Sequence, residues 1–127
     1  MIQAQEGSLG FRGAYPFETV IAEKFHAMVL LGRAKPRMKD YYDIWMLLRA
    51  FDPAPARVRQ ALAATFARRG TSIPADVPGG LSDAFASDAG KQRQWAAFAR
   101  NVAGPPPALG QVIDELRQRL TIYLDRG

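Results

Sequence analysis

Apolar residues recur at helical spacing between residues 17 and 31. At 100° per residue, the positions that share one face of such a helix are Phe17, Val20, Ile21, Met28 and Leu31. Tyr15-Pro16 favours an extended residue just before this segment, and Gly32 is typical of the position just past a helix end. The pattern therefore predicts a helix over residues 17–31.

Further stretches show the same spacing or clear helix-boundary residues: 37–51, 55–69, 81–85, 88–102 and 109–124. Ser87 is placed to cap the helix at 88–102. Strand signals are nearly absent, so we expect an all-α fold, a single bundle of five to six helices. We assign residues 15–127 to this helical domain. Residues 1–14 contain three glycines and predict an irregular tail with room for one short strand at 9–11.

Lys24 lies at the centre of the predicted apolar face of the first helix. An unpaired ammonium group costs several kcal/mol to bury, or loses its proton as its pKa falls. Three arrangements avoid that cost. Lys24 pairs with a carboxylate inside the fold, binds an anionic ligand, or carries its charge to the surface on its flexible stem.

The second helix supplies acidic partners on its own apolar side. Asp40 lies within that face and Asp43 toward its edge, whereas Lys39 points to solvent. One alternative is a Lys24–Asp40 ion pair that only fixes the register of the two helices, since such pairs are a poor source of net stability. The other is a site in which Lys24 holds an anion and Asp40 or Asp43 acts as a base or metal ligand.

The chain has a formal net charge of +5, with arginine far more frequent than lysine, which favours partners that carry phosphate. A genome rich in G and C explains frequent arginine equally well, and the arginines are scattered along the chain. The absence of cysteine excludes disulfides, thiol nucleophiles and cysteine metal sites. No stretch has the length of a membrane span and no secretion signal is visible, so we expect a cytoplasmic protein.

Other candidate residues have simpler interpretations. His26 faces away from the apolar side, and a single histidine near Glu23 makes a poor metal site, so we predict a surface residue and no metal ligands. Arg37 either pairs with Asp40 or contacts a phosphate, and pairing is favoured. Tyr42 and Trp45 have the chemistry to stack on bases, but packing explains them as well.

The lysine and the aspartates belong to the stretches "YPFETVIAEKFHAMVLLG" and "RMKDYYDIWML", which contain an AEK motif and a KDxxD motif. Together with "FARRGT" and "LSDAFASDAGKQRQWAAF", these stretches resemble the later, helical portion of AbiEii/AbiGii-type abortive-infection toxins, a nucleotidyltransferase family. The resemblance begins near Leu9 and extends over nearly the whole remaining chain. It implies that this chain is equivalent to the C-terminal helical domain of a nucleotidyltransferase toxin from a toxin–antitoxin or phage-defence system.

The resemblance also implies roles for individual residues. Lys24, with Arg37, would contact the phosphate of a nucleotide, and Asp40, with Asp43 as its neighbour, would assist catalysis. The complete family enzyme uses Mg²⁺ and an NTP, and some members transfer nucleotides to RNA, notably tRNA. Its metal-binding motif is Gly-Ser followed by Asp-x-Asp. This chain has Gly7-Ser8 but no Asp-x-Asp, so we expect no cofactor in this chain alone and no catalysis without a metal-binding half.

That departure is consistent with a truncated gene product, a mis-assigned start or a split domain. The expected partners are an NTP, an RNA substrate, an antitoxin protein and a second copy of the chain, bound through exposed apolar helix faces. The alternative function is a non-enzymatic helical interaction module that self-associates or binds a protein partner.

Overall fold

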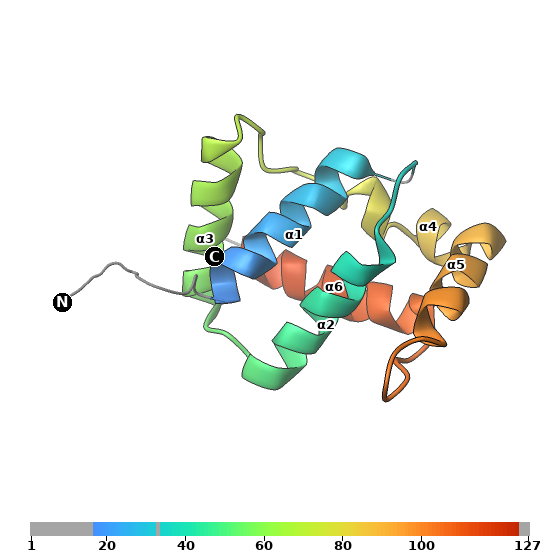
Figure 1. The fold of residues 1–127 in the computed structure, drawn as a ribbon. Helices are drawn as coiled ribbons and strands as arrows, with labels where there is room; N and C mark the ends of the chain where they lie inside the picture. Colours follow the sequence, from blue (N-terminus) through green and yellow to red (C-terminus); the bar gives the residue numbers. More distant parts are fainter. Residues whose placement is uncertain (1–16, 33, 125–127) are drawn as a thin grey trace.

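The computed structural model describes residues 17–32 and 34–124, which form a bundle of α-helices with one turn of 3-10 helix (Figure 1). In chain order the elements are α1 (Phe17–Leu31), α2 (Met38–Phe51), α3 (Pro55–Arg68), the 3-10 turn η1 (Gly79–Leu81), α4 (Asp83–Ser87), α5 (Ala89–Ala99) and α6 (Leu109–Leu124). No strand occurs in this described part, so the predicted all-α class is confirmed. The predicted tail at residues 1–14, with its short strand, lies outside the described residues.

The long helices α1, α2, α3 and α6 are joined around one core. α2 and α3 each contact both α1 and α6, and so connect these two helices (Figure 1). The short helices α4 and α5 pack at one end, against α6 and α2. Each helix contributes large side chains that are almost fully buried, for example Phe25, Ile44, Leu62, Phe85, Trp95 and Ile113. Burial of such side chains is the main favourable contribution to the stability of the bundle.

The helix ends follow local chemistry. α1 ends at Leu31 because Gly32 adopts a φ of +59° and its N–H bonds to the carbonyl of Met28 at 2.9 Å. α2 ends at Phe51 because Asp52 takes a left-handed conformation with φ of 42° before Pro53. The predicted limits of the first and last helices match those of α1 and α6.

The prediction was wrong around residues 81–102. Leu81 belongs to the 3-10 turn η1, and the short helix α4 starts at Asp83 and not at residue 81 as predicted. Ser87 does not cap the next helix: its Oγ donates to the carbonyl of Asp83 at 2.8 Å and so closes α4. Asp88 is the cap, because its extended backbone ends α4 and its Oδ1 accepts from the N–H of Gly90 at 3.1 Å. The resulting helix, α5, also ends earlier than expected, at Ala99.

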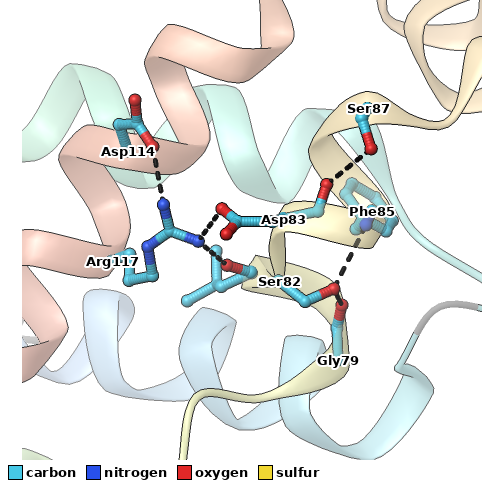
Figure 2. A network of polar contacts seen from close by, with 8 residues as sticks. Gly79, Ser82, Asp83, Phe85, Ser87, Asp114 and Arg117 are labelled. Carbon is cyan, nitrogen blue, oxygen red and sulfur yellow. Dashed lines mark hydrogen bonds and ion pairs between the residues drawn. The ribbon is translucent and has the colours of Figure 1, made fainter.

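The turn η1 is held by polar side chains from two helices. The hydroxyl of Tyr41 in α2 donates to the carbonyl of Gly80 at 2.8 Å. Figure 2 shows Arg117 of α6, whose Nη1 donates to the carbonyl of Leu81 at 3.1 Å and to Asp83 at 2.8 Å. Its Nη2 bonds to Asp114 at 2.7 Å. These bonds tie the turn to α2 and α6, and η1 also packs against α1 and α4.

Gly80→Ala should destabilise the fold. A Cβ atom at this position would lie 2.6 Å from the Tyr41 hydroxyl oxygen, so either the turn or the tyrosine must move and their hydrogen bond weakens. We expect a loss of about 1–3 kcal/mol in the free energy of unfolding, measured by urea denaturation. Gly110→Ala is the matched control, because a Cβ there meets no atom within 4 Å. Equal stability of the two variants would contradict this account of η1.

Candidate functional site

Lys24 extends from α1 across the seam to α2. Its Nζ lies 3.0 Å from Oδ1 of Asp40 and 3.2 Å from Oδ2 of Asp43, so one ammonium group bridges both carboxylates. The expectation that Lys24 occupies the centre of the buried face is wrong. The centre belongs to Ile21, Ala22, Phe25 and Met28, whereas 23% of the Lys24 side chain is exposed. The reason is that α1 packs most closely against α3, which turns the buried face toward Phe25.

The two aspartates also bind cations from their own helix and the linker before it. Nε of Arg37 lies 3.1 Å from Oδ2 of Asp40, as the favoured interpretation of Arg37 predicted. Lys39 is largely exposed, but its Nζ bonds to Oδ2 of Asp43 at 2.6 Å. The structure thus brings together all four residues singled out in the sequence: Lys24, Arg37, Asp40 and Asp43.

The environment keeps Lys24 charged. Burial by itself lowers the pKa of the ammonium group, but the hydrogen bonds and negative charges of Asp40 and Asp43 outweigh that effect, so the net pKa is raised above its ordinary value. Lys24 is therefore a fixed positive charge at neutral pH. It is suited to binding an anion and not to accepting a proton.

A pocket of about 350 Å³ opens beside this network. It is lined by Glu23, Lys24, His26, Ala27, Leu30, Leu31, Arg37, Asp40 and Arg69. Cationic side chains thus reach it from α1, from the linker before α2 and from the end of α3, while α1 contributes an apolar wall. A second hollow, lined in part by Thr19 and Val20, shares Glu23, Lys24 and Arg69 with the first. A concave surface of this kind fits a ligand with anionic groups at one end and an apolar part at the other.

Glu23 forms a second ionic cluster that the sequence did not predict. Its Oε1 accepts from Arg69 at 2.8 Å and its Oε2 from Arg68 at 2.6 Å, joining α1 to the end of α3. Burial raises the pKa of the Glu23 carboxyl, but the two arginines lower it further than that, so the net pKa lies below its ordinary value. The two partners are 45 and 46 residues away in the chain, so no local pattern indicates such a cluster.

The prediction that His26 is a surface residue is wrong. Only 5% of the residue is exposed, its Nε2 lies 2.9 Å from the hydroxyl of Thr71, and its ring packs edge-on against Phe66. α1 is buried on this side too, because Phe66 of α3 and Thr71 after it contact His26.

The described residues do not fit a metal ion. They contain no group of three or more His, Asp or Glu side chains placed to hold one. Both oxygens of Asp40 and Oδ2 of Asp43 face ammonium or guanidinium groups at ion-pair distance, so these oxygens already have cationic partners. Hard divalent cations need several free oxygen ligands, which this arrangement does not offer.

Tyr42 and Trp45 are packing residues in this structure. Tyr42 lies edge-on to Phe98 with ring centroids 5.7 Å apart. Trp45 donates its ring N–H to Glu115 of α6 at 3.1 Å and lies beneath the guanidinium of Arg49.

Among the described helices, none is long and apolar enough to cross a membrane.

Glu23→Gln should make stability less dependent on pH in acid. Because the folded-state pKa of Glu23 is lowered, its contribution is complete above the ordinary glutamate pKa of 4.5 and is lost as pH falls through the lower folded value. Urea denaturation of the wild type and the variant between about pH 5 and pH 3 measures this difference. Asp76→Asn is the control, because Asp76 is exposed in the loop between α3 and η1, and this variant should behave as the wild type. Parallel pH profiles for Glu23→Gln and the wild type would show that the cluster does not stabilise the carboxylate.

The model of the family described as nucleotidyl transferase AbiEii toxin, type IV TA system, matches residues 13–121, which include α1 to α5 and most of α6. Searches of curated proteins and of solved structures found no match. The match covers far more than half of the chain and includes Lys24, Arg37, Asp40 and Asp43, so the chain belongs to the AbiEii nucleotidyl transferase toxin family.

Proposed function

We propose that this chain supplies the phosphate-handling part of a nucleotidyl transfer site, located at the seam between α1 and α2. Lys24 contacts a phosphate of the nucleotide, Arg37 adds a second contact, and Asp40 assists catalysis with Asp43 beside it. The observation that carries the proposal is the bridging position of Lys24, charged and partly exposed, at the wall of a pocket that other cations also line.

The charge balance of the pocket supports an anionic ligand. Lys24, Arg37 and Arg69 line it against the carboxylates of Glu23 and Asp40, so cations are in excess. A nucleotide triphosphate is an anion of the right kind, because its transfer depends mainly on positioning and on fixed positive charge near the phosphates. The family to which the chain belongs, with its nucleotidyl transferase and toxin–antitoxin description, supports the same ligand class.

The contacts of Asp40 suggest how it acts. Its Oδ1 faces Lys24 and its Oδ2 faces Arg37, so without a ligand it orients both cations toward the pocket. Phosphate oxygens compete for the same cations. When they bind, Asp40 gains freedom to position the hydroxyl of an acceptor or to take its proton, while a new phosphate ester forms and pyrophosphate leaves. Asp43 keeps Lys24 in place during this exchange.

Magnesium with the NTP requires carboxylates that the described residues do not provide. We therefore expect this chain to bind nucleotide without transferring it unless those ligands are supplied. RNA, including tRNA, is the proposed acceptor, and an antitoxin is the proposed protein partner in a cytoplasmic toxin–antitoxin system. The basic sequence, with a pI of about 10.0, is consistent with RNA, and the family description is consistent with an antitoxin.

Nucleotide binding should depend on Lys24. Titration calorimetry with ATP, CTP, GTP and UTP in the presence of magnesium should show binding of at least one nucleotide. Lys24→Ala should weaken it about tenfold or more, because a charge-assisted contact to phosphate is lost. Lys91→Ala removes the same charge from α5, away from the pocket residues, and should bind as the wild type.

Two results would reject the nucleotide site. One is the absence of heat with all the nucleotides, and the other is equal affinity of Lys24→Ala and the wild type. Either would favour the alternative of a helical interaction module. Exposed apolar side chains such as Leu30, at 68%, and Phe51, at 57%, would then be the first residues to test for self-association.

A further inference from the structure

Two arginines at the end of α3 share one carboxylate of α1. Arg69 donates to Oε1 of Glu23 through Nε at 3.1 Å and Nη2 at 2.8 Å, and Arg68 donates to Oε2 through Nη2 at 2.6 Å. The cluster therefore carries more positive than negative charge. Among the described residues, Nη1 of each guanidinium group makes no hydrogen bond and stays available for another acceptor.

This cluster is continuous with the pocket of Lys24. Arg69 and Glu23 line both that pocket and the adjoining hollow, which Arg68 also lines. Glu23 and Lys24 are neighbours in α1, one directed to α3 and the other to α2. An anion bound by Lys24 would therefore have the guanidinium group of Arg69 at the same cavity wall.

The exposure of the cluster makes a purely structural role a poor explanation. About half of each arginine side chain is exposed, 57% for Arg68 and 52% for Arg69. Ion pairs between exposed groups add little to stability, because solvent screens them and long side chains must be ordered. Because the cluster is exposed and its ion pairs are weak, another anion can replace Glu23 with little loss of free energy. Planar guanidinium groups are also the side chains best matched to phosphate oxygens.

We propose that Arg69 and Arg68 form a second phosphate subsite beside Lys24, and that Glu23 holds their guanidinium groups in place until phosphate oxygens displace it. This inference rests on the proposed nucleotide site, since it extends the same cavity. The phosphates belong either to the polyphosphate tail of a nucleotide or to the backbone of an acceptor RNA. Both present the same anionic oxygens to the arginines.

The test measures affinity for two probes, sodium tripolyphosphate and a single-stranded oligoribonucleotide of about ten nucleotides, at several salt concentrations. Arg69→Gln should bind at least one probe about tenfold more weakly, with a shallower salt dependence. Weaker binding of tripolyphosphate by Arg69→Gln would assign the subsite to the nucleotide. Weaker binding of the oligoribonucleotide alone would assign it to the acceptor RNA. Arg100→Gln, an exposed arginine at the end of α5, is the charge-matched control and should bind both probes as the wild type.

Glu23→Gln tests directly whether phosphate displaces Glu23 from the arginines. If Glu23 competes with phosphate, removing its charge should tighten binding severalfold, whereas loss of a structural clamp would leave affinity unchanged or weaker. Circular dichroism checks that each variant is folded, and Arg68→Gln replaces Arg69→Gln if the latter is not.

Unchanged binding of both probes by folded arginine variants would overturn the subsite, and failure of Glu23→Gln to tighten binding would overturn the displacement. Lys24→Ala separates the two proposals. If it loses affinity while the arginine variants do not, only the subsite fails. If the arginine variants lose affinity while Lys24→Ala does not, the nucleotide site as proposed fails.

Discussion

The ammonium group of Lys24, placed between Asp40 and Asp43, is the interaction on which the arrangement of the site depends. A lysine at the edge of a core must have an acceptor, because desolvation of an unpaired charge would cost more than a small domain can spare. The short connection between α1 and α2 brings the acceptors to it. The paired charges then set how the two helices face each other, and they leave the amine at the wall of a pocket.

α1 meets its two neighbouring helices with opposite charges. Lys24 faces the carboxylates of α2, and Glu23, the residue before it, faces the arginines at the end of α3. Consecutive residues of a helix point about 100° apart, so a helix flanked on two sides can use adjacent positions for different partners. The pocket lies where these two clusters meet, which explains why cations from α1, α3 and the linker before α2 line one cavity.

Much of the fold was predictable because it depends on local patterns. The limits of α1 and α6 follow from apolar spacing and from residues such as Gly32 that end a helix. The contact of Lys24 with Asp40 was predictable because the two residues lie on consecutive helices. The contact of Arg37 with Asp40 was predictable because they lie within one helical turn. His26 was misplaced because its burial comes from residues such as Phe66 and Thr71, far along the chain. Ser87 was misassigned because Asp88 offers an equally good cap one residue later.

The amino-acid sequence by itself determined the helical class, the limits of α1 and α6, and the pairing of Lys24 with an aspartate on the next helix, because these depend on spacing within about 25 residues of chain. The tertiary structure alone decided which face of α1 is buried, that Glu23 binds Arg68 and Arg69, and that both clusters share one cavity. Those features depend on how α3 packs across α1. Contacts between distant segments are set by the fit of whole side-chain surfaces, which no local pattern records.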